Sequence, residues 1–416
     1  MTESHVYPLF NSTTLDNGVR VVSERIPSVR SIAVGAWLAA GSRDEAPEAS
    51  GISHFIEHMV FKGTRRRRMH HIAQRMEAVG GYLNAFTSKE YTCYYARGLD
   101  EHLERALDVV LDLVIDPTLP ERDVEKEKEV VVEEMKMYED APEDLIFDRF
   151  ESVLYPHHPL GRPVLGVPET VRSFSRDQLF DYIDDHYAPN RLVVAVAGNI
   201  EHDAIVRQVE RLTRELDREP TPIHRAPANG YAPEEQIERR PIQQAHLVIG
   251  TRAPGMTDPR RTVLTTLNTL LGGGMSSRLS QNIREKYGYC YNIYSFANML
   301  SDTGDFGVYM GTDATKVDRS RKLIQRELDK LAQTPVSARS LTQAKNQLKG
   351  SLMLGLESMS NRMMRLGRIE LTFGRYFSLD EIIASIDAVT AEEVRDLAAE
   401  LFAPDRLSTV AILPEA

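Results

Sequence analysis

The stretch GISHFIEHMVFKGT, residues 51–64, carries two histidines and a glutamate in the order His-x-x-Glu-His, namely His54, Glu57 and His58. Its apolar residues predict a single short helix, with Ser50 before it as the candidate N-cap and a glycine near its end as the stop. Residues three and four apart lie on the same helix face. Both imidazoles can therefore face one ion, with the Glu57 carboxylate beside them.

Two imidazoles at this spacing suit Zn²⁺, which catalytic sites hold with three protein ligands and a water molecule. Zinc lowers the pKa of that water, and a neighbouring carboxylate can take its proton during attack on a carbonyl. The order is the mirror of His-Glu-x-x-His and is known as the inverzincin pattern. The alternative is an amphipathic helix with two surface histidines, and a third ligand is needed to decide between them.

A long helix predicted over residues 121–138, ERDVEKEKEVVVEEMKMY, is rich in candidate third ligands. Glu127 and Glu134 are seven residues apart, about two turns, so they share one face. Val131 lies nearly on that face, which indicates that the face turns inward. The remaining glutamates of the helix are expected on its exterior. Spacing alone does not choose the ligand among them.

The composition of the chain limits the classes of function. A length of 416 residues predicts two to three domains, and the net charge of −11 argues against a broad basic surface for nucleic acid. No apolar run is long enough to span a membrane, and the first residues do not resemble a signal peptide, so a cytoplasmic location is expected. Cys93 and Cys290 have no metal-binding spacing and are predicted to be buried free thiols.

The order of predicted elements appears twice along the chain, as strand, helix, helix, two strands and further helices. This predicts an α+β fold of two duplicated domains, each a mostly antiparallel sheet packed with helices. The proposed boundaries are 1–216 and 241–416, with a Pro-rich, charged linker over 217–240. Strands are predicted over residues 19–22, 31–38, 82–86, 91–97, 192–198, 245–251, 289–298 and 304–311. Further helices are predicted over residues 65–79, 100–115, 144–155, 258–271, 276–286, 317–331 and 341–373.

Three other motifs invite a ligand-binding interpretation. The run Arg65–Arg68 is either a phosphate site or, as we prefer, a solvated face. The glycines 272–274 lack the lysine and spacing of a phosphate loop and predict a hinge or tight turn. The pair His157 and His158 precedes a proline, which favours a loop over a second metal site.

Three segments together resemble the pitrilysin family of zinc peptidases: HFIEHMVFKGT, GGYLNAFT and EVVVEEMKMYED. The resemblance is to its bacterial members and to the β subunit of mitochondrial processing peptidase, and it extends over nearly the whole chain. It implies one Zn²⁺ per chain, held by His54, His58 and Glu134. It also implies that Glu57 is the general base and that Glu127 supports the site without being a primary ligand.

The resemblance further implies how a peptide is held. Arg284 and Tyr291, within IREKYGYCYNIYSF, would bind substrate carbonyls; their structural alternatives are a surface ion pair and the sheet core. Asn84, Ala85 and Phe86 would form an edge strand that pairs with an extended peptide.

The expected protein is a zinc endopeptidase for short or unfolded peptides, with each chain forming half of a clamshell. Because this chain has both the zinc motif and the Arg–Tyr pair, a homodimer is expected, with Arg284 and Tyr291 reaching the partner's zinc. Three alternatives stay open: a processing protease for one presequence-like peptide, a non-catalytic subunit with a vestigial site, and a zinc hydrolase of non-peptide substrates. The acidic net charge weakly favours basic peptides.

Overall fold

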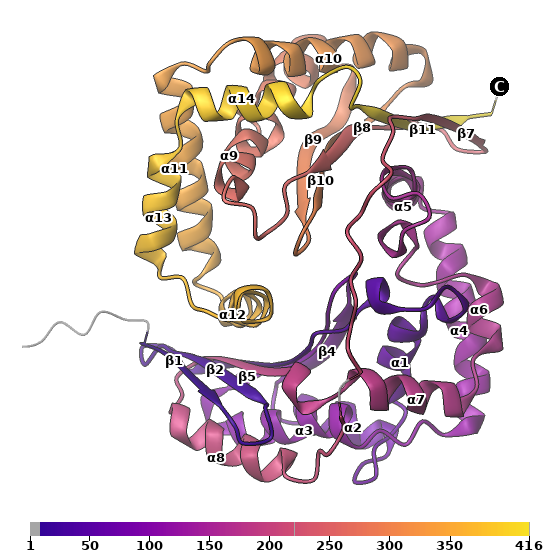
Figure 1. Cartoon of the computed structure of the whole chain (residues 1–416), viewed down its shortest axis with the longest axis vertical. Coiled ribbons are helices and arrows are strands. Elements are labelled where there is room, and N and C mark those ends of the chain that lie inside the picture. The colour runs from indigo at the N-terminus through magenta and orange to yellow at the C-terminus, as the bar shows by residue number, and fades with distance from the viewer. Residues whose placement is uncertain (1–8, 220, 416) are drawn as a thin grey trace, which may run out of the picture. The chain divides into compact units, whose positions relative to one another are not determined.

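The computed structural model describes residues 9–219 and 221–415, which form two compact units (Figure 1). The first unit contains residues 9–135, Pro163–Arg225 and Gly355–Tyr376. The second contains Lys136–Arg162, Ala226–Leu354 and residues 377–415. The predicted domains 1–216 and 241–416, joined by the linker 217–240, are each continuous in sequence. The two units are not continuous, because Lys136–Arg162 belongs to the second unit and Gly355–Tyr376 to the first.

The first unit is built on a six-stranded sheet with the order β1-β2-β6-β3-β5-β4. Only the β2–β6 pair is parallel. The strand β4 therefore lies at one edge, paired with β5 alone among the described strands. The strands are β1 (Leu9–Thr14), β2 (Arg20–Arg25), β3 (Ser31–Leu38), β4 (Tyr82–Thr87), β5 (Thr92–Leu99) and β6 (Leu192–Gly198).

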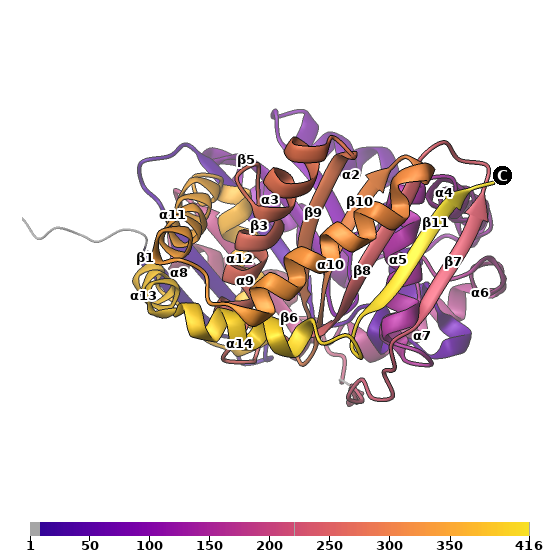
Figure 2. The same ribbon diagram turned by 90° about the horizontal axis from the view of Figure 1, so that it is seen from above.

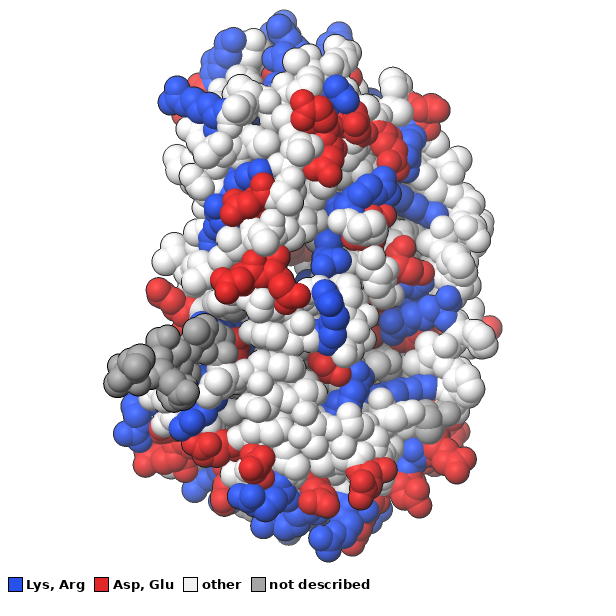
Figure 3. Space-filling model, turned by 60° about the vertical axis from the view of Figure 1, so that its left-hand side comes forward, with Lys and Arg blue, Asp and Glu red and all other residues white. Residues whose placement is uncertain are grey.

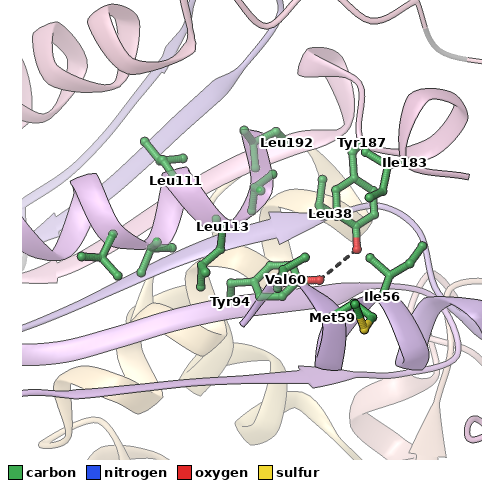
Figure 4. Close-up of a cluster of buried hydrophobic side chains, with 14 of the residues drawn as sticks. Leu38, Ile56, Met59, Val60, Tyr94, Leu111, Leu113, Ile183, Tyr187 and Leu192 are labelled. Atoms are coloured by element: carbon green, nitrogen blue, oxygen red, sulfur yellow. Dashed lines mark hydrogen bonds between the residues drawn. The ribbon is translucent and has the colours of Figure 1, made fainter. Parts of the chain in front are cut away.

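One face of this sheet packs against helices and forms the larger core. Strand residues with alternate spacing, such as Val34 and Leu38 of β3, point into it. Figure 4 shows Tyr94 and Tyr187 within this core, where their hydroxyls form a 2.9 Å hydrogen bond. The helices of this part of the chain are α1 (Ile52–Val60), α2 (Met69–Glu77), α3 (Leu103–Ile115), α4 (Glu121–Glu139), α6 (Pro168–Ser173), α7 (Arg176–His186) and α8 (His202–Thr213).

The opposite face of the same sheet is covered by α12 (Met359–Phe373), a helix from far along the chain. Trp37 of β3 points to this face, and its indole N–H donates to the Met363 sulfur at 3.4 Å. Gly367 lies against the same indole, since a Cβ on it would be 2.3 Å from Trp37 atoms. The helix therefore approaches the sheet only because this position has no side chain.

We expect Gly367→Ala to lower the free energy of unfolding by about 1–3 kcal/mol, because the added methyl overpacks the contact with Trp37. Urea unfolding followed by the emission of Trp37, the only tryptophan of the chain, measures this. The matched control is Gly350→Ala in α11 (Ala338–Gly355), where the new Cβ meets nothing within 4 Å. Equal unfolding midpoints for both variants would contradict the packing argument.

The second unit repeats the arrangement of the first. Its five-stranded sheet has the order β7-β11-β8-β10-β9, and only the β7–β11 pair is parallel. This order matches β2-β6-β3-β5-β4 strand for strand, which confirms the predicted duplication and the α+β fold. The strands are β7 (Glu235–Arg240), β8 (Ala245–Ala253), β9 (Cys290–Met299), β10 (Gly304–Thr312) and β11 (Ser408–Pro414).

Helices cover both faces of the second sheet as well. Figure 2 shows α10 (Val317–Gln333) and α14 (Ala391–Leu401) over one face, which they cover together with α9 (Arg261–Gly272). The other face packs against α5 (Pro142–Leu154), through residues such as Phe150. The helix α13 (Leu379–Ala388) packs near α9.

Several predicted elements differ from the structure. The helix expected over 341–373 is two helices, because α11 ends at Gly355 and Ser358 caps α12 by accepting from the Asn361 N–H. The last six residues of the expected linker form β7, whose side chains alternate in exposure. The helix expected at 276–286 is π-helical over Ser280–Glu285. The elements that the sequence analysis does not predict are β1, α6, α7, α8, α13, α14 and β11.

The arginine run does not belong to the helix predicted over 65–79, since α2 begins only at Met69. Arg66 and Arg67 instead form ion pairs with Asp108 and Asp112. Gly272 is the last residue of α9, and Gly273 and Gly274 form a bend after it. Cys93 and Cys290 are buried free thiols, as predicted. No helix in the described part of the chain is both long and apolar enough to cross a membrane.

Candidate metal centre

The helix that carries the histidine motif is anchored at its first turn by Glu45. The two carboxylate oxygens of Glu45 accept from the Gly51 N–H at 2.7 Å and the Ser53 N–H at 2.9 Å. A carboxylate at a helix N-terminus satisfies free N–H groups and complements the helix dipole. The sequence-based choice of Ser50 as N-cap is wrong: Gly51 occupies that position with φ +93°, and no side chain of its own caps the helix.

The remainder of α1 divides into two faces. Phe55, Ile56 and Met59 are fully buried in the core. The opposite face presents His54 and His58, whose ring centroids are 4.6 Å apart. The amphipathic pattern that makes the helix pack thus also determines the direction of both imidazoles.

Glu134 of α4 completes a three-residue cluster with these histidines. Its Oε2 atom lies 3.9 Å from His54 Nε2 and 3.4 Å from His58 Nε2. One ligand atom from each residue lies within 4.8 Å of the others. Tetrahedral zinc with bonds near 2 Å needs ligand separations of about 3.3 Å. The cluster therefore fits this ion after small side-chain movements.

Glu127, two turns earlier on α4, orients His58 without facing the other histidine. Its Oε1 lies 2.9 Å from His58 Nδ1, and its Oε2 is 2.6 Å from Lys62 Nζ. A carboxylate at Nδ1 favours the tautomer with the proton on that nitrogen, which leaves Nε2 free as a ligand. This contact is the one expected of a supporting residue. The part played by Lys62 was not predicted from the sequence.

Glu57 is half-buried beside the cluster and is held by Thr87, whose hydroxyl donates to its Oε2 at 2.6 Å. Burial raises the pKa of the Glu57 carboxyl above its ordinary value, while the Thr87 hydrogen bond and the nearby His58 oppose that rise. A raised pKa moves a carboxylate toward the range useful for a general base near neutrality. Thr87 was predicted only as part of a hairpin.

The strand β4 brings the predicted peptide-binding residues to a free sheet edge. Asn84, Ala85 and Phe86 pair with Tyr95, Tyr94 and Cys93 of β5, and no described strand pairs with their other side. The prediction of an edge strand is confirmed. Because Thr87 at the end of β4 contacts Glu57, the free edge leads directly to the metal cluster.

The comparisons with known proteins agree with this geometry. Residues 20–167 match the family described as Insulinase (Peptidase family M16), and residues 173–348 match Peptidase M16 inactive domain. The chain belongs to peptidase family M16. It is therefore a member of the pitrilysin-type zinc peptidases that its motifs resemble.

Individual relatives support the assignment. The "Uncharacterized zinc protease YmxG" of Bacillus subtilis (strain 168) is 44% identical over 394 residues, covering 94% of this chain and 95% of the relative. A "Probable mitochondrial-processing peptidase subunit beta" of Arabidopsis thaliana is 37% identical, covering 93% of this chain and 75% of the relative. A crystal structure of a protease from Helicobacter pylori has the same fold, with a TM-score of 0.92, 22% identity and coverage of 98% and 100%.

Arg284 and Tyr291 lie in the second unit of this M16 chain. Arg284 belongs to the π-helical turn, and its guanidinium carbon lies 5.5 Å from the centroid of the Tyr291 ring. Tyr291 is in β9, at an edge of the second sheet, and is 86% exposed. The core position considered for Tyr291 is thus wrong. The two side chains neighbour each other and are accessible, and their roles stay predictions.

The histidine pair at 157–158 has a structural setting in the M16 fold. His158 caps the short turn that follows it, because its Nδ1 accepts from the Leu160 N–H at 3.2 Å. Its Nε2 lies 3.1 Å from the Ala226 carbonyl oxygen. Among the described residues, the only group of three or more metal-binding side chains is His54, His58 and Glu134.

The two histidines of the metal-free M16 centre differ in protonation. Burial, together with the charge of His58, lowers the pKa of His54 to about 4. Burial by itself lowers the pKa of His58, but hydrogen bonds and charges from Glu127 and Glu134 outweigh it and raise that pKa to about 9. At neutral pH and without a bound metal, His54 is thus neutral and His58 carries an additional proton. A metal must displace this proton to reach Nε2.

We expect zinc uptake by the metal-free protein at pH 7 to release about one proton. Apparent zinc affinity should rise about tenfold per pH unit while His58 is protonated and should level off above its pKa of about 9. Isothermal titration in buffers of different ionisation enthalpy measures the released proton. Glu127→Gln lowers the His58 pKa and should reduce the release. A binding enthalpy independent of the buffer would contradict this prediction.

Proposed function

We propose that this M16 chain is a zinc-dependent endopeptidase that hydrolyses short or unfolded peptides. The observation that carries the proposal is the convergence of His54, His58 and Glu134 within one unit, with the Glu57 carboxylate held beside them. The proposed ligand set is His54, His58 and Glu134, with one Zn²⁺ per chain. Relatives named zinc proteases are consistent with that ion.

When bound, Zn²⁺ supplies the Lewis acidity that lowers the pKa of water and polarises a carbonyl group. Glu57 is the general base in this proposal: it accepts a proton from the attacking water and delivers it to the leaving amine nitrogen. Thr87 binds one carboxylate oxygen of Glu57 and leaves the other available to accept the proton. Glu127 keeps His58 in the tautomer that leaves Nε2 free.

The substrate is proposed to bind as an added strand along β4. The backbone of Asn84, Ala85 and Phe86 then provides hydrogen bonds that do not depend on substrate sequence. Because a peptide must be extended to pair in this way, folded proteins are excluded and short or unfolded chains are favoured. Arg284 and Tyr291 are proposed to bind backbone carbonyls near the cleaved bond, and the exposure of Tyr291 is compatible with that role.

The proposed assembly is a homodimer in which Arg284 and Tyr291 act on the partner's substrate. Its basis is the presence of the zinc motif and the Arg–Tyr pair in one chain. The oligomeric state is measured by sedimentation, and the sharing of sites needs a separate test.

Subunit mixing tests the sharing of sites. Glu57→Gln and the double variant Arg284→Ala, Tyr291→Phe are each expected to be nearly inactive as homodimers. Random mixing makes half of the dimers mixed, and one of two sites in each is then intact if the pair acts in trans. Recovery of about a quarter of wild-type activity is therefore expected from the co-expressed variants. Recovery no greater than the sum of the two homodimers would show that the pair acts within one chain.

Two alternatives are separated by substrate scope. A library of random peptides should be cleaved broadly by a general endopeptidase and at few sequences by a processing protease. A non-catalytic subunit would cleave none of them, whether or not it binds zinc. The processing protease is kept as the second candidate function because one relative is named as a processing peptidase subunit.

A further inference from the structure

A cavity of about 560 Å³ lies within the first unit where β4 begins, at the end of the strand away from Thr87. Its walls come from the first residues of β3, the last residues of β5, the glycines before β4 and the start of α12. Tyr82 and Arg97 are its largest polar side chains. No carboxylate is among the described residues that line it. The function proposed above makes no use of this cavity.

Arg97 is an available cation in this cavity. It is exposed, its guanidinium carbon lies 4.7 Å from the Tyr82 ring centroid, and it forms no ion pair with any described carboxylate. The acidic residues next to the lining are Asp100 and Glu357. Asp100 is engaged by Arg30 at 3.0 Å and by Asn199 at 2.7 Å, and Glu357 is exposed outside the lining. The cavity therefore carries a positive charge that is not neutralised from within.

The register of the sheet relates this charge to a peptide on β4. Tyr82 and Arg97 are cross-strand partners, so both side chains lie on the sheet face covered by α12. A peptide paired along the free edge of β4 projects every second side chain to one face of the sheet. The residue opposite Tyr82 then projects its side chain to the same face as Tyr82. One such side chain would lie beside the Tyr82 ring, within reach of the guanidinium above it.

The same register gives the distance along β4 from Tyr82 to the end of the strand near Glu57. Thr87, which contacts Glu57, is five residues beyond Tyr82 along β4. At about 3.4 Å per residue this is about 17 Å. A peptide residue opposite Tyr82 is accordingly about five residues from the cleaved bond.

We propose that Tyr82 and Arg97 form a remote substrate subsite that binds a carboxylate side chain, Asp or Glu, about five residues from the cleaved bond. The guanidinium donates charge-assisted hydrogen bonds to the carboxylate, while the tyrosine ring contacts its aliphatic stem. This inference rests on the proposed binding of peptides along β4. Over the face shown in Figure 3, basic and acidic residues are interspersed. At this one position the preferred substrate side chain is acidic, whereas the net charge of the chain weakly favours basic peptides.

The first experiment compares cleavage of quenched fluorescent peptides that differ only in Glu, Gln or Lys at five residues from the cut, on either side. Wild type should cleave the Glu peptide about three- to tenfold faster than the Lys peptide, measured as kcat/KM at low salt. Arg97→Glu should reverse that order, with the rate for the Gln peptide lying between those for the Glu and Lys peptides. The peptides carry amidated C-termini; a peptide with a free C-terminus at the same spacing tests whether a chain end is bound as well as a side chain.

Arg207→Glu in α8 is the matched control, because it makes the same change in net charge at an exposed residue of a helix that packs on the other face. It should retain the wild-type order. Reversal by Arg207→Glu as well, or no reversal by Arg97→Glu, would overturn the subsite.

A binding measurement separates the subsite from the catalytic proposal. In a Glu57→Gln background, fluorescence anisotropy of the same labelled peptides reports affinity without cleavage. Tighter binding of the Glu peptide, reversed when Arg97→Glu is added, supports the subsite even if wild type cleaves no peptide and the proposed function fails. Equal affinities for the Glu and Lys peptides in both backgrounds would overturn it even if cleavage is normal.

Discussion

Glu57→Gln is expected to reduce peptide cleavage on the order of a thousandfold while leaving zinc content unchanged. The amide keeps the size of the side chain and can still accept a hydrogen bond from Thr87, but it cannot take a proton from water at neutral pH. Because Glu57 is not one of the three clustered ligand residues, the metal should be retained. Cleavage of a quenched peptide of about a dozen residues and zinc per chain measure both quantities.

Zinc content and peptide cleavage together decide between the candidate functions. Zinc in both proteins with cleavage only in wild type is the expected result. Zinc in both with cleavage in neither would favour a narrow processing protease or a subunit that needs a partner. Equal cleavage by wild type and Glu57→Gln would show that another group takes the proton, and the proposed mechanism would be wrong.

Glu134→Gln is expected to weaken zinc binding by at least about a thousandfold and to abolish cleavage with it. The change removes the only carboxylate of the cluster, and a neutral amide oxygen is a poor zinc ligand. Dialysis against a graded zinc buffer followed by metal analysis gives the affinity. The loss of zinc binding should be visible as a lower zinc content per chain, independently of any activity measurement.

Glu133→Gln is the matched control for this change, because it alters the neighbouring residue on the exposed side of α4. It should retain zinc and activity, and thermal unfolding of the metal-free forms checks that both variants fold. If Glu134→Gln kept its zinc, the third ligand would be a different residue. Glu127, which contacts His58 at its other ring nitrogen, would then be the first candidate.

Local periodicity was a sufficient guide for α1. Its apolar residues face the core, so the histidines necessarily share the opposite face, and the structure confirms it. The spacing of Glu127 and Glu134 likewise placed both on one face of α4. The residues themselves did not choose between them, because the choice depends on how far α4 is displaced along α1, which no local pattern reports.

Contacts between distant segments were beyond the reach of sequence patterns. Glu45 at the start of α1 and Thr87 beside Glu57 come from loops or strand ends whose sequences look ordinary. The continuous helical pattern of 341–373 concealed a break whose second part packs on Trp37. The sequence of β7 resembles a linker, because β7 is an edge strand without fully buried residues.

The sequence by itself determined the helix that carries His54 and His58, the spacing of two candidate glutamates and the duplication of an α+β unit. These depend on hydrophobic period and motif order, which are local properties of the chain. Only the tertiary structure decided that Glu134 meets both histidines, that Thr87 holds Glu57, and that Arg97 lies unneutralised at the far end of β4. A periodic pattern tells which face of an element is apolar, and packing alone selects the element that this face meets.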